Sequence, residues 1–229
     1  MNKKSFDYFD LKRQYLDFLK KNETTGKPII DKVGKLNKFY LPLSRWIYRI
    51  YKKDNKIKII GLSGGQGAGK STITKILKFI FKIKYGLELC VFSIDDFYKT
   101  RADRLKMSKK HHHLFLTRGV PGTHDIGLIN KIFTKLKKKN FKTVLIPKYD
   151  KSIDNRIKKS KWMKVKNQPN IIIFEGWCIG AKSQKNNRLK KSLNIVESKH
   201  DADLKWRKEV NYHLSTSYRK LFDKIDKLI

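Results

Sequence analysis

The sequence predicts an α/β fold, a three-layer α/β/α sandwich on a mostly parallel sheet, with a helical extension at its N-terminus. Three short apolar runs, at residues 57–60, 87–94 and 170–174, have the composition of buried strands. Segments with apolar residues at helical spacing separate these runs. Alternation of strands with helices favours parallel pairing, because each crossover places a helix on a face of the sheet.

The chain of 229 residues divides into a helical extension at 1–54 and one α/β domain at 55–229. In the extension, apolar side chains recur at helical spacing over 5–21, and a turn at 24–28 breaks the pattern. A second helix is predicted to run toward Tyr51, with Pro42 as a kink or boundary. The final stretch, 206–225, has one apolar helical face that we expect to pack on the sheet.

A glycine-rich turn follows the first predicted strand and precedes a predicted helix. It matches G-x-x-x-x-G-K-[ST], the phosphate-binding loop (P-loop) of nucleotide-binding proteins, at every fixed position. Glycines allow successive backbone N–H groups to surround an anion, and the helix N-terminus adds a partial positive charge. We therefore expect ATP to bind at Gly64, Gly65, Gln66, Gly67, Ala68, Gly69, Lys70, Ser71 and Thr72.

Lys70 is predicted to reach the β- and γ-phosphates, and the Ser71 hydroxyl to hold Mg²⁺. Carboxylates end two of the predicted strands: Asp95 and Asp96 follow 87–94, and Glu175 follows 170–174. Ligands bind at the carboxyl ends of parallel strands, so these acids are placed to face the phosphates. The aspartates could instead only cap the next helix. Glu175 fits the Walker B pattern, in which the acid holds Mg²⁺ directly or through water.

Two loops offer side chains for a second substrate. The loop at 117–125 contains an arginine, a histidine and an aspartate, although its Thr123 or Asp125 could also simply cap the following helix. A third strand candidate at 143–146 is followed by a polar cluster, which suggests one common rim. The candidate acceptor residues are Tyr98, Arg118, His124, Asp125, Tyr149 and Arg156. Arg118 or Arg156 could bind a substrate carboxylate in bidentate fashion.

Composition limits the remaining classes of function. The 55 basic and 20 acidic residues give a net charge of +35, but the lysines are scattered rather than gathered into one arm. Such scatter favours a compositional bias over a nucleic-acid footprint. The two cysteines fit free buried thiols in a reducing compartment, and neither a signal core nor a membrane span is predicted. We expect a cytoplasmic protein with no membrane partner; its oligomeric state is open.

Five segments together resemble the D-glycerate 3-kinase group of P-loop kinases, relatives of uridine kinase, phosphoribulokinase and bacterial pantothenate kinase. They are GGQGAGKST, SIDDFYKTRADR, TRGVPGTHD, PKYDKS and IIIFEGWCIGA. The resemblance implies that Asp95, the first acid of a D-x-F-Y element, is the catalytic base beside Lys70, and that Glu175 is the Walker B acid. Members of the group continue past the long helix into another strand and a nucleotide-covering region. This sequence ends at Ile229, so adenine and lid residues are not assigned.

The expected function is transfer of the γ-phosphoryl group of ATP, with Mg²⁺, to a hydroxyl of a small acidic metabolite such as D-glycerate. One alternative is another small acceptor, a nucleoside or a pantothenate-like compound. The other is a nucleic-acid-associated or non-catalytic nucleotide-binding protein. Steep salt dependence of nucleic-acid binding would favour the last class.

Overall fold

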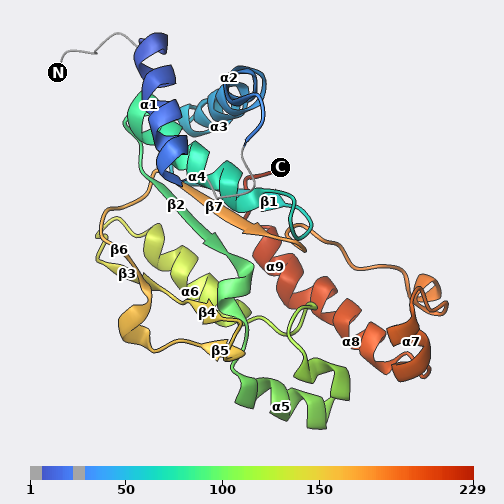
Figure 1. Cartoon of the computed structure of the whole chain (residues 1–229). Coiled ribbons are helices and arrows are strands. Elements are labelled where there is room, and N and C mark those ends of the chain that lie inside the picture. Colours follow the sequence, from blue (N-terminus) through green and yellow to red (C-terminus); the bar gives the residue numbers. More distant parts are fainter. Residues whose placement is uncertain (1–6, 23–28) are drawn as a thin grey trace.

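The computed structural model of this chain describes residues 7–22 and 29–229. Its centre is a four-stranded sheet in the order β2-β7-β1-β8, in which every neighbouring pair is parallel (Figure 1). The bounds are β1 (Lys58–Ser63), β2 (Leu89–Ser93), β7 (Ile171–Gly176) and β8 (Lys227–Leu228). The predicted parallel sheet is confirmed, with β1 in its middle and the following turn at its carboxyl edge.

Helices cover both faces of this sheet, because residues along each strand alternate between two apolar cores. On one face, Ile60 of β1 and Ile173 of β7 pack with α3 (Leu41–Lys52) and α4 (Lys70–Ile80). On the other face, Ile59 and Phe174 pack with α6 (Ile126–Leu136) and with α9 (Arg219–Phe222). The three-layer α/β/α arrangement is therefore as predicted (Figure 1).

The N-terminal helices pack on the outside of α4. They are α1 (Tyr8–Asn22) and α2 (Lys32–Lys35), and a π-helical turn at Leu36–Tyr40 joins α2 to α3. Tyr15 and Leu36 share a core with Ile76 and Ile80 of α4. Pro42 lies in the first turn of α3, directly after the π-helical turn, at the boundary that the sequence predicted. The predicted break at 24–28 lies outside the described residues, and the domain boundary at 54 stays a prediction.

The strand predicted at 143–146 does not join the common rim. It is β3 (Val144–Ile146), and it pairs antiparallel with β6 (Met163–Val165) in a separate hairpin. Between them, β4 (Tyr149–Asp150) and β5 (Asn155–Arg156) form a smaller antiparallel pair. This excursion leaves β2 at the edge of the parallel sheet, and the turn between β4 and β5 lies near the carboxyl end of β2.

The C-terminal part departs from expectation in two places. Residues 181–200, predicted as a loop, contain α7 (Ile195–His200), and the long last helix comprises α8 (Lys205–His213), a π-helical turn and α9. The strand β8 was not predicted. It pairs with β1, and Asp226 accepts a hydrogen bond from the backbone N–H of Ile59 at 2.7 Å just before it. Two residues are too few to carry a strand pattern in sequence.

Candidate active site

The glycine-rich turn lies between β1 and α4, at the carboxyl edge of the sheet. Gly67 and Gly69 have φ values of 78° and 81°, which side-chain-bearing residues rarely adopt. No side-chain hydrogen bond caps α4, which leaves the backbone amides of its first turn available to an anion. The Lys70 ammonium lies over the same loop and donates to the carbonyls of Gly64 at 2.7 Å and Gly65 at 2.9 Å.

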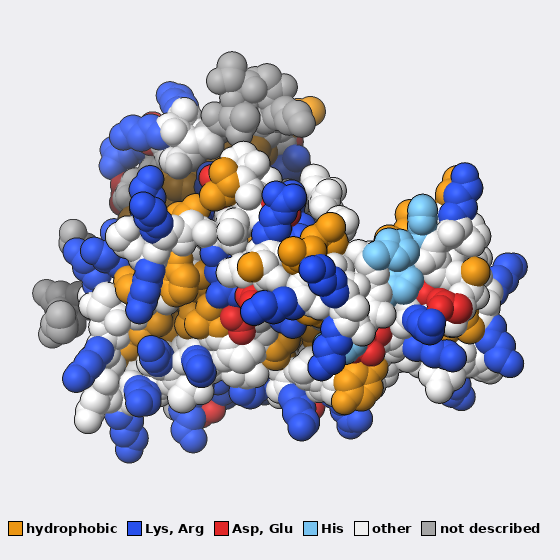
Figure 2. All heavy atoms as spheres, turned by 90° about the horizontal axis from the view of Figure 1, so that it is seen from below, with side chains coloured by type: hydrophobic (Ala, Val, Ile, Leu, Met, Phe, Trp, Pro, Cys, Tyr) orange, Lys and Arg blue, Asp and Glu red, His pale blue; other side chains and the backbone are white. Residues whose placement is uncertain are grey.

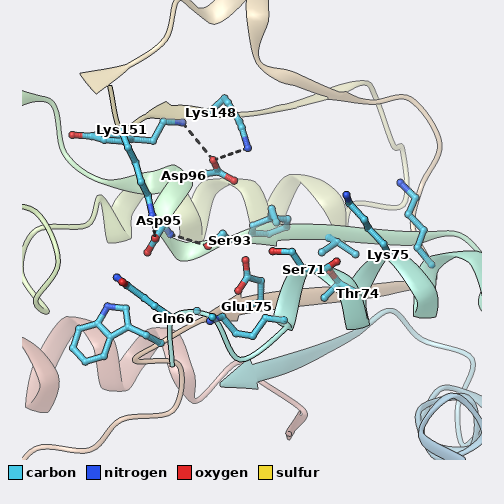
Figure 3. Close-up of a pocket in the computed structure, with 18 residues that line it drawn as sticks. Gln66, Ser71, Thr74, Lys75, Ser93, Asp95, Asp96, Lys148, Lys151 and Glu175 are labelled. Carbon is cyan, nitrogen blue, oxygen red and sulfur yellow. Dashed lines mark hydrogen bonds and ion pairs between the residues drawn. The ribbon is translucent and has the colours of Figure 1, made fainter. Parts of the chain in front are cut away.

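A cavity of about 640 Å³ opens beside this loop, and it brings the sequence-predicted acids to the P-loop lysine. Figure 3 shows Ser71, Glu175 and Asp95 around the same space, arriving from α4, β7 and the end of β2. Five lysines and three acids line this cavity: Lys70, Lys75, Lys78, Lys148, Lys151, Asp95, Asp96 and Glu175. The carboxyl ends of β1, β2 and β7 thus converge on one site.

Asp95 stands in a short 3₁₀ turn, Ile94–Phe97, directly after β2. One of its carboxylate oxygens accepts the Tyr98 hydroxyl at 3.1 Å, and the other lies 2.9 Å from the Lys151 ammonium. The Ser93 hydroxyl accepts the Asp95 backbone N–H and so fixes the start of this turn. Asp95 is therefore held at the cavity wall by two donors from different segments.

Glu175 and Asp96 are the more buried acids of the cavity. Burial raises the pKa of both above that of an ordinary carboxyl, with a hydrogen bond from Ser93 and the charge of Lys70 acting in the opposite direction on Glu175. On Asp96, the charge of Lys148 opposes the same effect, and the backbone N–H of Tyr149 donates to its carboxylate at 3.4 Å. Asp96 was not assigned a role from sequence.

These residues fit a magnesium nucleotide. Backbone amides at a helix N-terminus together with a lysine form a binding site for phosphate oxygens. The Ser71 hydroxyl and the Glu175 carboxylate are oxygen donors, the kind that Mg²⁺ prefers. Both lie in the cavity that contains Lys70. A Cβ at Gly65, Gly67 or Gly69 would meet no atom of the described chain within 4 Å, so the loop's surface is open to a ligand.

Of the six predicted acceptor residues, two adjoin the cavity. Tyr149 lines it, and Tyr98 contacts Asp95 and packs edge-on against Tyr149 at a ring distance of 5.3 Å. Burial, with the nearby Asp95 charge, raises the pKa of Tyr98, and burial raises that of Tyr149 to about 12. Both phenols therefore stay protonated and act as donors.

Arg118 does not line the cavity; it forms an ion pair with Asp154, and its guanidinium lies 5.8 Å from the centre of the Tyr149 ring. The fully buried Arg104 joins the same cluster and donates to Asp154 at 2.7 Å and to the Tyr149 hydroxyl at 2.9 Å. Burial alone would raise the pKa of Asp154, but its donors Arg104, Tyr149 and Arg118 lower it to about 2. Sequence reasoning missed Arg104 and Asp154, which are separated by 50 residues.

The remaining three candidates contact Tyr98 or one another, and only His124 among them is fully buried. Arg156 donates to the Asp125 carboxylate at 2.9 Å and to the Tyr98 carbonyl at 2.8 Å. Asp125 also caps α6, as the alternative reading of that loop predicted. His124 is buried, stacks on Tyr98 and shares a 2.6 Å hydrogen bond with the Tyr218 hydroxyl. None of the three lines the cavity, and this geometry favours a positioning role for them; their predicted contacts with the acceptor stay a prediction.

On the face that Figure 2 shows, the positive charge has no single focus. Figure 2 shows Lys and Arg side chains over the whole visible face, as the scattered lysines predicted. Three consecutive histidines stand at 111–113. A ring nitrogen of His112 lies within 4.8 Å of carboxylate oxygens of Asp201 and Asp203. Those acids already pair with Arg207 and Lys205.

Both cysteines, Cys90 and Cys178, are buried and unbridged, as expected, and burial raises the pKa of each thiol to about 12. Among residues 7–22 and 29–229, helices that combine the length and apolarity needed to cross a bilayer are absent.

A parallel sheet with a P-loop after its central strand, and acids at the neighbouring strand ends, defines a P-loop phosphate-binding fold. The sequence model of the phosphoribulokinase / uridine kinase family matches residues 59–211, and the chain belongs to this family.

Relatives agree with this assignment. The chain is 32% identical to an uncharacterized kinase of Schizosaccharomyces pombe, mug58, in an alignment of 78% of this chain and 65% of that protein. It is 31% identical to the chloroplastic D-glycerate 3-kinase of Arabidopsis thaliana, over 68% of this chain and 38% of that protein. The chain thus spans between about two fifths and two thirds of these relatives' length.

A solved D-glycerate 3-kinase from Cryptococcus neoformans has the same fold. The TM-score is 0.70 at 24% identity, with 82% of this chain and 71% of that chain covered. The resemblance to this group of P-loop kinases, inferred from five motifs, is confirmed at the level of family and fold.

Proposed function

We propose that this chain is an ATP-dependent kinase that transfers the γ-phosphoryl group to a hydroxyl of a small acidic metabolite, D-glycerate. One observation carries the proposal: Lys70, Asp95 and Glu175, from three separate segments, line one cavity at the P-loop. Membership in the phosphoribulokinase / uridine kinase family and similarity to a plant D-glycerate 3-kinase support it.

In the proposed reaction, an acceptor oxygen forms a bond to the γ-phosphorus as the bond from that phosphorus to the β,γ-bridging oxygen breaks. The electron pair stays on the departing ADP, and the hydroxyl proton passes to Asp95. Lys70 and the loop amides neutralise charge on the transferred group. Ser71 and Glu175 would hold Mg²⁺, which would further neutralise the phosphate oxygens.

Tyr98 and the Arg156–Asp125 pair position the base. Tyr98 donates its hydroxyl to one oxygen of Asp95, and Arg156 holds the Tyr98 backbone through its carbonyl. Asp125 in turn anchors Arg156 while capping α6. These contacts connect Asp95, through Tyr98, Arg156 and Asp125, to the N-terminus of α6. We expect them to keep the Asp95 carboxylate oriented toward an acceptor.

A coupled ADP-release assay with D-glycerate, uridine and pantothenate tests the proposal. We expect turnover with D-glycerate that requires Mg²⁺, with Asp95→Asn lowering kcat by about 10²–10⁴-fold while nucleotide binding persists. Lys70→Ala should weaken both ATP affinity and turnover. Turnover with uridine or pantothenate and none with D-glycerate would show that the acceptor is not D-glycerate. ATPase activity that only nucleic acid stimulates, with steep salt dependence, would overturn the kinase assignment.

A further inference from the structure

One cation of the cavity makes direct contact with the proposed base. Lys151 lies in the turn between β4 and β5, and its ammonium is 2.9 Å from an Asp95 oxygen (Figure 3). The Lys151 side chain is 57% exposed, so this ion pair faces the cavity and solvent. Exposed ion pairs contribute little to the stability of a fold, so stability alone does not explain this contact.

The two arginines expected to bind a substrate carboxylate are engaged elsewhere. Arg118 pairs with Asp154, and Arg156 pairs with Asp125. Neither lines the cavity. Lys70 lies over the P-loop, and Lys148 lies 3.4 Å from Asp96. Of the lysines that line the cavity, Lys151 is the one whose ammonium contacts Asp95 in the described structure.

We propose that Lys151 binds the anionic group of the acceptor, and that its distance from Asp95 restricts acceptors to short hydroxy acids. This rests on the proposed kinase function. A lysine ammonium has three donor hydrogens, so Lys151 can bind a substrate carboxylate while it remains beside Asp95. The acceptor would then span from Lys151 to Asp95, with its anion on the lysine and its hydroxyl on the aspartate.

The distance between the Lys151 ammonium and the Asp95 carboxylate sets an upper limit on the length of the acceptor. The ammonium and the Asp95 oxygen are 2.9 Å apart. A hydrogen bond of about 2.8 Å at each end limits the separation of acceptor hydroxyl and carboxylate oxygens to about 8.5 Å in a straight line, and to less in a bent one. A three-carbon hydroxy acid fits this span. A nucleoside offers no anion, and the carboxylate of pantothenate lies at the far end of an amide-linked chain from its primary hydroxyl.

The test compares Lys151→Met and Lys151→Arg with Lys159→Met, which removes an exposed lysine outside the cavity. Activity is measured with D-glycerate and with glycerol, a neutral acceptor of the same length. We expect Lys151→Met to lower kcat/KM for D-glycerate by about 10- to 100-fold more than it lowers kcat/KM for glycerol, mainly through KM, while the KM for ATP changes little. Lys151→Arg should retain part of the affinity, and Lys159→Met should match the wild type.

A binding measurement separates this inference from the proposed reaction. With a non-hydrolysable ATP analogue present, D-glycerate should raise the melting temperature of the wild type and of Lys159→Met, but not of Lys151→Met. Turnover of D-glycerate with an unchanged KM in Lys151→Met would overturn the role of Lys151 and leave the kinase intact. Lys151-dependent binding without turnover would overturn the reaction and leave the role of Lys151 intact. An absence of D-glycerate binding to the wild type would overturn both.

Discussion

Glu175 of β7 lies directly opposite Ser93 of β2 in their parallel register, and the Ser93 side chain forms a hydrogen bond with the Glu175 carboxylate. The same Ser93 hydroxyl accepts the backbone N–H of Asp95. One serine thus connects the proposed metal-binding acid to the turn that carries the proposed base, although they are 80 residues apart. Strand pairing therefore fixes the relative positions of these two acids. Four predictions about the site and its surroundings can be measured.

Glu175→Gln should keep the stability of the fold but raise the Mg²⁺ concentration that activity requires. Burial raises the pKa of Glu175, so its neutral form is the more compatible with the fold, and this stabilising contribution is lost as pH rises through the folded pKa. The carboxylate therefore costs stability once it is ionised, and Gln removes that cost. We expect a melting temperature at or above the wild type and a Mg²⁺ requirement raised by about 10- to 100-fold. A lowered melting temperature with normal Mg²⁺ dependence would contradict this.

Gly69→Ala should impair nucleotide binding through the backbone. Gly69 has a φ of 81° and its missing Cβ faces open space, so the penalty is conformational and not steric crowding. We expect a loss of about 1–2 kcal/mol in unfolding free energy together with weaker ATP binding. Gly86→Ala, with a φ of 62° and similarly open surroundings, is the matched control and should lose stability but keep ATP affinity. Equal ATP affinity in both variants would count against the loop as the phosphate site.

Arg156→Met should behave as a structural change. Its guanidinium is largely buried and holds both Asp125 and the Tyr98 carbonyl. Loss of these charge-assisted hydrogen bonds should lower the unfolding free energy by about 1–3 kcal/mol, as measured by urea titration. Arg101→Met, which removes an exposed arginine at the start of α5 (Arg101–Lys110), serves as the control. A rise in KM for the acceptor without loss of stability would show that Arg156 binds the acceptor.

His124 should make the protein sensitive to mild acid. Burial lowers the pKa of His124 from 6.5 to about 3, so the folded state keeps it neutral while the unfolded chain takes up a proton. The unfolded state binds more protons below pH 6.5, and stability falls as pH decreases toward 3, by at most about 1.4 kcal/mol per pH unit. Urea titrations at pH 7, 6 and 5 measure this slope.

Two variants isolate the contribution of His124 to that slope. His124→Gln should flatten it in part, because burial shifts the pKa of His213 in the same direction. His113→Gln, at an exposed position, should leave it unchanged. An identical slope in the wild type and in His124→Gln would contradict the assignment of the acid sensitivity to His124.

The local part of the site could be read from the sequence. The P-loop is one continuous segment whose glycines, lysine and serine have fixed spacing, and the strands before Asp95 and Glu175 are contiguous apolar runs. β3 was misplaced, because an apolar run identifies a strand but not its partner; its pairing with β6 depends on residues 17 to 21 positions away. The roles predicted for the site residues remain to be tested by the variants above.

The sequence by itself determined the phosphate loop and the acids at the strand ends, because local spacing and strand direction are enough to fix them. Only the tertiary structure decided which cations face the base. Arg118 and Arg156 pair with Asp154 and Asp125, whereas Lys151 reaches Asp95 from a turn 56 residues away. Such pairings depend on how β4 and β5 fold back toward the end of β2, and long-range charge pairing leaves no periodic trace in a single sequence.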